Sequence, residues 1–76
     1  MRQGIKEKDI RDFEKYANKL ADVLERIRKY KPEANAYLAG NDLNLMSNAS
    51  HDYYGHGHPE HSVTCIYMNG FDGGDW

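Results

Sequence analysis

All four histidines of this chain fall within residues 51–61, in the stretch HDYYGHGHPEH. Neutral imidazoles that converge on one ion, each oriented by a further hydrogen-bonding partner, are typical ligands of Zn²⁺ and Ni²⁺. Residues two apart in an extended segment point to the same side, so the side chains of His56 and His58 can face one ion. The candidate metal ligands are His56, His58 and His61, with His51, Asp52 or Cys65 available to complete the shell.

The same stretch also has the composition of a polar turn. Gly55, Gly57 and Pro59 are common turn residues, and the side chains of Ser50 and Asp52 can fix a turn by accepting hydrogen bonds from nearby amides. The sequence has one cysteine, so it lacks the paired Cys-x-x-Cys spacing that marks many zinc sites. We therefore expect a turn without a cofactor and keep a zinc site as the alternative hypothesis.

A cysteine nucleophile is the remaining catalytic candidate in this part of the sequence. Cys65 lies four residues after His61, which would place a thiol and a base on the same face of a strand. However, a cysteine in the most apolar strand of a chain is usually a small buried side chain, and no basic residue near it would activate the thiol. The sequence also lacks the phosphate-binding loop, the dinucleotide-binding glycine pattern and G-x-S-x-G. We expect no catalytic residue and no enzymatic activity.

The elements that must position these residues begin with a long amphipathic helix, predicted over residues 7–30. Its apolar residues recur every three or four positions and form two adjacent seams, so the apolar stripe is broad. The seams are Ile10, Phe13, Ala17, Leu20, Leu24 and Ile27, and Phe13, Tyr16, Leu20, Val23, Ile27 and Tyr30. Asp9 is a candidate cap for the helix start, and the alternative is a start nearer Ile5. Pro32 disfavours helical geometry at the residue before it.

The rest of the chain predicts a β-meander. Residues 36–39 and 43–47 flank a short turn at 40–42, and residues 61–69 form the most strand-like segment, followed by a glycine-rich tail at 70–76. Both faces of the last strand are partly apolar, so we expect it to be the central strand, with Cys65 buried. The predicted fold is α+β, a single domain of residues 1–76 in which one long N-terminal helix packs on a three-stranded antiparallel sheet.

A lone helix covers only one face of such a sheet. The other face would expose apolar side chains unless a partner or a second copy of the chain covered it, so homodimerisation through the helix or the open sheet face is one expectation. Trp76, at the end of the tail, either fills the edge of the core or anchors a partner.

Charge is strongly polarised along the sequence. Residues 1–31 hold ten basic and six acidic residues, whereas residues 32–76 hold six acidic residues and no Lys or Arg, so the two parts carry +4 and −6. Charges alternate in sign along the basic part, which is typical of a solvated helix face and does not favour direct nucleic-acid binding. The sequence has no apolar run long enough to cross a bilayer and no apolar signal region at its start, so we expect a cytoplasmic protein without membrane contact.

Several C-terminal motifs carry a resemblance to a known group of proteins. The segments LNLMSNASHD and HSVTCIYMNG, and the terminal DGGDW, resemble small proteins of phages and prophages with a Ser-His-Asp box and a final Asp-Gly-Gly-Asp-Trp. The resemblance covers residues 36–76 and does not include His56 and His58. It implies a mobile-element protein that works in a bacterial host, and it implies no mechanism.

The functional hypothesis is a small non-enzymatic phage protein that binds and blocks a host protein, as a counter-defence inhibitor of the anti-CRISPR type does. Its acidic half can complement a basic nucleic-acid-binding surface on the partner, and its aromatic residues can serve as anchors. The candidate partner-binding residues are Asp42, Asp52, Tyr53, Tyr54, Glu60, Phe71, Asp72, Asp75 and Trp76. The alternatives are a metal-binding protein that uses the histidine cluster, or a homodimeric assembly protein.

Overall fold

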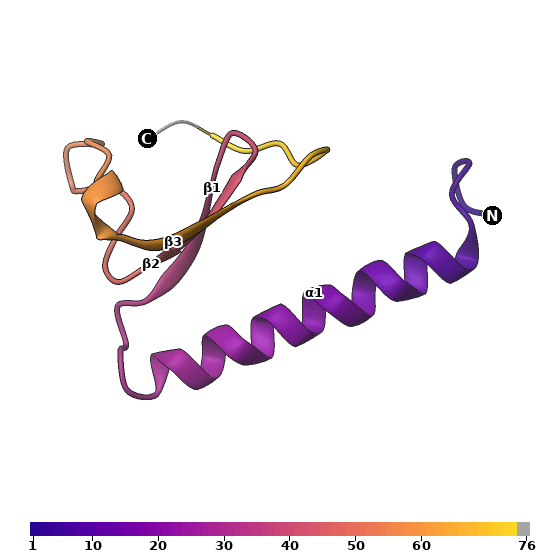
Figure 1. The fold of residues 1–76 in the computed structure, drawn as a ribbon, viewed down its shortest axis with the longest axis horizontal. Coiled ribbons are helices and arrows are strands. Elements are labelled where there is room, and N and C mark those ends of the chain that lie inside the picture. Colours follow the sequence, from indigo (N-terminus) through magenta and orange to yellow (C-terminus); the bar gives the residue numbers. More distant parts are fainter. Residues whose placement is uncertain (75–76) are drawn as a thin grey trace.

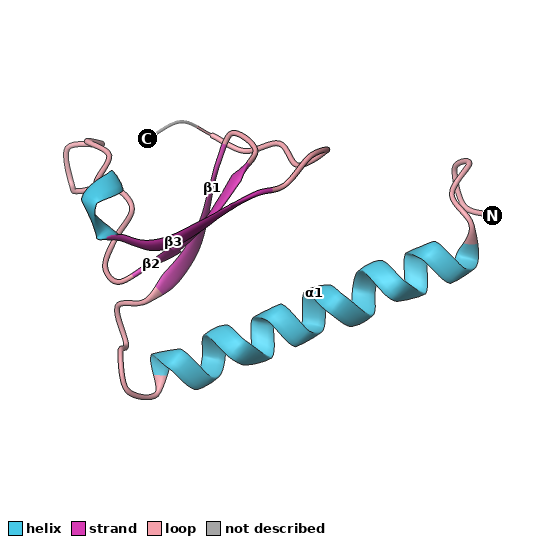
Figure 2. Cartoon of the chain, viewed as in Figure 1, coloured by secondary structure: helices cyan, strands magenta, loops and turns pink. Residues whose placement is uncertain are grey.

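The structure is a computed structural model, and it describes residues 1–74. It contains one long helix and a three-stranded antiparallel sheet, so the predicted α+β class is confirmed (Figures 1 and 2). The elements in chain order are α1 (Glu7–Arg28), β1 (Asn35–Ala39), β2 (Asp42–Met46), the short 3₁₀ helix η1 (Pro59–His61) and β3 (Ser62–Tyr67).

Helix α1 follows the apolar periodicity of the sequence and begins at the predicted residue, but its cap differs from the prediction and it ends two residues early. Lys6 occupies the cap position and makes no side-chain cap, so the expected role of Asp9 as cap is wrong. Asp9 lies in the first turn, where its charge favours the positive end of the helix dipole. After Arg28 the backbone tightens, because the amides of Lys29 and Tyr30 donate to the carbonyls three residues earlier, those of Arg26 and Ile27. The chain then turns at Pro32 and Glu33.

Strands β1 and β2 form the predicted hairpin. Ala39 pairs with Asp42, which leaves a two-residue loop of Gly40 and Asn41. Gly40 has a φ of 59° and Asn41 does not have a positive φ, as in a type II′ turn, and a glycine adopts this geometry at the first loop position without steric cost.

Strand β3 lies at the edge of the sheet, and β2 is the central strand. The prediction that β3 is central was therefore wrong, and so was the expected burial of Cys65, which is exposed. The apolar residues on both faces of β3 suggested cover on both sides, but Val63 and Ile66 are 66% and 57% exposed. Their apolar character thus reflects surface that residues 1–74 leave largely uncovered.

The two faces of the sheet have different surroundings. On the face toward α1, Leu43 of β2 pairs with Leu38 of β1 on one side and with Ile66 of β3 on the other. On the opposite face, Met46 and Asn44 are buried at 0% and 3% exposure. The Asn44 side chain donates to the carbonyl of Asp42 and accepts from the Ser62 hydroxyl, so this buried amide is satisfied.

The C-terminal segment runs beside β1. The amide of Gly40 donates to the carbonyl of Gly74 over 2.8 Å, and Ala39 and Gly74 form a single parallel bridge. Gly73 lies so close to β1 that a Cβ there would overlap the carbonyl oxygen of Leu38. The tail is therefore too irregular for a strand, as its composition predicted, yet it covers the outer edge of β1 at its C-terminal end.

The helix does not pack closely on the sheet. No residue of α1 is buried, and the N-terminal end of the helix extends past the sheet (Figure 1). The Cα radius of gyration is 14.4 Å, whereas a compact chain of 76 residues would have about 11 Å. The close packing expected from the amphipathic pattern is replaced by an open groove. No helix of the described chain is long and apolar enough to cross a membrane.

Candidate functional site

The first candidate site is the groove between α1 and the sheet. Its walls are mostly apolar residues of the helix and of all three strands, with Asn44 and Thr64 as the two polar ones. We call it the apolar groove. Its lining residues are Leu20, Val23, Leu24, Ile27, Ala36, Leu43, Asn44, Leu45, Thr64 and Ile66.

The groove continues toward the N-terminal end of α1. There the helix contributes Phe13 and Tyr16, and the segment after β3 contributes Met68 and Phe71. Phe13 is 70% exposed and Phe71 40% exposed, so both rings are accessible to a partner. The ammonium groups of Lys15 and Lys19 each lie 5.5 Å from the centre of the Tyr16 ring. Both lysines therefore make cation–π interactions with Tyr16 at the edge of the groove.

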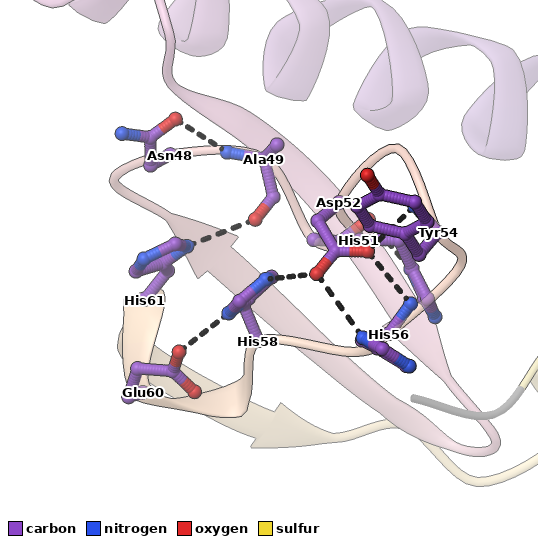
Figure 3. A network of polar contacts seen from close by, with 10 residues as sticks. Asn48, Ala49, His51, Asp52, Tyr54, His56, His58, Glu60 and His61 are labelled. Atoms are coloured by element: carbon purple, nitrogen blue, oxygen red, sulfur yellow. Dashed lines mark hydrogen bonds and ion pairs between the residues drawn. The ribbon is translucent and has the colours of Figure 1, made fainter.

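The second candidate site is the histidine loop, residues 48–61, which Asp52 organises (Figure 3). One carboxylate oxygen of Asp52 accepts hydrogen bonds from the amides of Tyr54 and His56 at 2.8 and 3.0 Å. The other oxygen lies 3.3 Å from Nε2 of His58 and 3.4 Å from Nδ1 of His56. The turn-fixing role predicted for Asp52 is therefore correct.

His51 and Ser50 support the same loop. His51 pairs with Gly57, its Nδ1 lies 3.2 Å from the Ser50 hydroxyl, and its ring meets the Tyr37 ring edge-on at a centroid distance of 5.3 Å. The Ser50 carbonyl accepts from the amide of His58 over 2.7 Å. These bonds join the two sides of the loop and connect it to the sheet.

The tightest polar cluster is formed by η1 and the residue before it. Nδ1 of His58 lies 2.6 Å from a carboxylate oxygen of Glu60, and Nδ1 of His61 lies 2.9 Å from the carbonyl oxygen of Ala49 (Figure 3). The rings of His58 and His61 stack with their centres 5.0 Å apart. Within the described residues, His58, Glu60 and His61 are the one group of three potential metal ligands whose donor atoms all lie within 4.8 Å of one another.

Hydrogen bonds within this cluster shift the pKa values of His58, Glu60 and Asp52. The hydrogen bond to Glu60, with a further one to Asp52, raises the pKa of His58 above its usual value. The same contact with His58 lowers the pKa of Glu60. The pKa of Asp52 is also lowered, chiefly by the hydrogen bond from the His56 amide and then by the one from Tyr54. The cluster is therefore most favourable as an imidazolium between two carboxylates.

The structure brings only two of the three predicted metal ligands together. His58 and His61 lie together, but Glu60 takes the place expected for His56, which is exposed and contacts Asp52 instead. Cys65 lies in β3 opposite Asn44, outside this group.

The predicted partner-binding residues fall into three places. Tyr53 and Tyr54 are 95% and 80% exposed at the tip of the histidine loop. Asp42 and Asp72 are exposed near the hairpin turn and in the tail, whereas Asp52 and Glu60 bond histidines within the loop. Phe71 lines the apolar groove, and Asp75 and Trp76 lie outside the described residues.

The helix side of the groove was not among the predicted partner-binding residues. Phe13, Tyr16 and Leu20 were identified in the apolar seams, which were expected to pack on the sheet or to form a dimer interface. The periodicity of a helix shows which face is apolar, but it does not show whether that face is covered by the same chain or by another. The large aromatic share of this face was the available indication, since aromatic residues are enriched at interfaces.

Comparison with protein-family models, with curated proteins and with solved structures finds nothing that matches this chain.

Proposed function

We propose that this is a non-enzymatic phage or mobile-element protein that binds and blocks a host protein, in the manner of an anti-CRISPR-type inhibitor, and that the partner occupies the apolar groove. The observation that carries the proposal is the amount of exposed surface. The chain exposes 6012 Å², whereas a compact monomer of 8.8 kDa exposes about 4,800 Å².

The excess of about 1,200 Å² matches what a protein interface needs. A standard interface removes about 800 Å² from each partner, so the excess would supply one with surface to spare. Much of this surface is apolar, because Phe13, Tyr16 and Leu20 on α1 and Ile66 on β3 are all about half or more exposed. Covering them would lower the free energy by about 25 cal/mol for each Å² of apolar area.

Charge supports a basic partner. The part of the chain from residue 32 onward has no Lys or Arg, and Asp42 and Asp72 are exposed without an ion pair to any other described residue. Asp42 and Asp72 are next in sequence to Leu43 and Phe71, which line the part of the groove toward the N-terminal end of α1. An apolar contact bordered by acids fits a host protein with a basic nucleic-acid-binding surface.

A pair of cross-linking positions on α1 tests the proposal. A photoreactive residue replaces either Leu20, which lines the groove, or Asn18, which lies on the opposite side of the helix. We expect cross-links to one host protein from position 20 and none from position 18. The captured protein is then purified and mixed with this chain, and we expect a 1:1 complex in which its nucleic-acid binding or cleavage is lost.

Two variants complete the test. Leu20→Glu should raise the Kd of the reconstituted complex at least tenfold, because a charge would be buried without a partner, while Asn18→Glu should leave it unchanged. Circular dichroism checks that both variants keep the helix. If position 20 cross-links only to another copy of this chain, the groove is a dimer interface and the inhibitor proposal fails. Unchanged activity of the captured protein in the complex would also overturn it.

A further inference from the structure

We propose that His58, Glu60 and His61 form a binding site for one Zn²⁺ ion at the η1 turn. The inference does not rest on the protein-binding proposal, because the site lies in the histidine loop and the groove takes no part in it. It begins with the turn. The amide of His61 donates to the carbonyl of His58 over 3.0 Å, and Pro59 fixes φ at the first residue of η1.

This turn explains why the two imidazoles lie together. His58 directly precedes η1 and His61 ends it, and the hydrogen bond between their backbones brings the two residues together. Their rings are nearly parallel, with 17° between the planes. The carboxylate of Glu60, between them in sequence, already contacts Nδ1 of His58. Three donors of the right type are thus brought together by four consecutive residues.

Each histidine also has the second partner that a metal ligand needs. Nε2 of His58 faces Asp52, and Nδ1 of His61 faces the carbonyl oxygen of Ala49. These acceptors fix which nitrogen carries the proton, and they leave Nδ1 of His58 and Nε2 of His61 as the nitrogens that can bind an ion. A turn that merely exposed its histidines to water would not need an acceptor on each ring.

The donor set selects the kind of ion. Two imidazoles and one carboxylate suit Zn²⁺, with a water molecule in the fourth position. Zinc–ligand bonds of about 2.0 Å in a tetrahedral arrangement place the donor atoms about 3.3 Å apart, and here they lie within 4.8 Å. Rotation of the exposed Glu60 side chain and tilting of the two stacked rings close this difference. A proton on Nδ1 of His58 is released to solvent as the ion binds.

The test is a titration of the untagged, chelator-treated protein with ZnCl₂, followed by native mass spectrometry. We expect a 1:1 adduct that a chelator removes, and we expect Co²⁺ to bind in the same ratio with the visible absorption of a four-coordinate ion. In NMR spectra, the ring signals of His58 and His61 should shift on addition of zinc, while those of His51 should not.

Substitutions assign the ligands. His58→Ala, His61→Ala and Glu60→Gln should abolish the adduct, and His56→Ala is the matched control that should retain it. Asp52→Asn keeps an acceptor for the backbone amides but not for the His58 ring, and it should weaken zinc binding about 10- to 100-fold. Circular dichroism confirms the fold of each variant. Absence of a 1:1 adduct, its survival in His58→Ala, or its loss in His56→Ala would overturn the proposal.

Discussion

Gly73 is the position at which the structure most clearly excludes any side chain. A methyl group there would overlap backbone atoms of Leu38, and backbone cannot move aside as a flexible side chain can. We expect Gly73→Ala to detach the C-terminal segment from β1 at a cost of about 1–3 kcal/mol, as overpacking does elsewhere. The amide of Gly40 reports this directly, because its acceptor is Gly74, and its hydrogen exchange should become at least tenfold faster.

Gly74→Ala is the control for this prediction. A Cβ at position 74 would lie 3.3 Å from the hydroxyl oxygen of Tyr37, at the far end of a side chain that can adjust. We expect the Gly40 amide to stay protected in this variant. Equal exchange rates in the two variants would show that the close approach at Gly73 does not hold the tail.

The cluster around His58 makes the stability of the metal-free loop depend on pH. Because the folded pKa of His58 is raised, its contribution is complete below about pH 6.5 and is lost as the pH rises through the folded value. Because the pKa values of Asp52 and Glu60 are lowered, their contributions are present above about pH 4 and are lost as the pH falls through the folded values. The loop should be most stable between about pH 4.5 and 6.5.

NMR titration of the His58 ring, with chelator present, measures how far the pKa of His58 is raised. His61 stacks on the ring and His56 shares Asp52 with it, so all three rings are followed together. Glu60→Gln should bring the pKa of His58 down, because its largest interaction is lost. A His58 pKa at or below 6.5 in the unsubstituted protein would contradict the prediction.

At the scale of elements, β2 carries the core and α1 contributes little to it. Met46 is fully buried, whereas Leu20 on the apolar stripe of α1 is 48% exposed. Met46→Ala should lower the free energy of unfolding by about 2–5 kcal/mol, and Leu20→Ala by about 1 kcal/mol or less. Urea denaturation measures both. An equal loss in the two variants would mean that α1 closes onto the sheet in solution.

The elements could be predicted from the sequence, but their packing could not. Apolar spacing and Pro32 defined α1, and Gly40 between two short apolar segments defined the hairpin, because both depend on local geometry. The edge position of β3 depends instead on the order of the strands in the sheet. Apolar residues such as Val63 and Ile66 occur in both central and edge strands, so they do not predict that order. The same limit hid the groove, since an amphipathic helix has the same pattern against its own sheet or against a partner.

The histidine loop was predictable in composition and only partly in geometry. His58 and His61 were named among the candidate ligands, and the structure places them side by side. Alternation in an extended segment favoured His56 as the third, but the chain turns at Pro59 into η1, where the spacing of three rather than two brings side chains together. Glu60 enters the cluster through that change of geometry, and a Pro followed by an acid was the available indication.

At the scale of the whole molecule, shape and charge point the same way. The 14.4 Å radius of gyration comes from a long helix set apart from an acidic sheet and loop. The helix itself holds equal numbers of acidic and basic residues, and the net positive charge of residues 1–31 lies at its two ends, on Arg2, Lys6, Lys29 and Lys31. Association with a second surface stabilises such a molecule more than a compact one, because the partner can cover the apolar groove and pair with the charges at the same time.

The position of the tail has a consequence for how sheets of this chain could associate. The hydrogen bond between Gly40 and Gly74 obstructs the outer edge of β1 at its C-terminal end, whereas β3 has an outer edge that no other described strand covers. A sheet with two free edges can add molecules without end and grow into fibrils. A sheet with one free edge can join only one other, edge to edge about a two-fold axis, and growth stops at the pair.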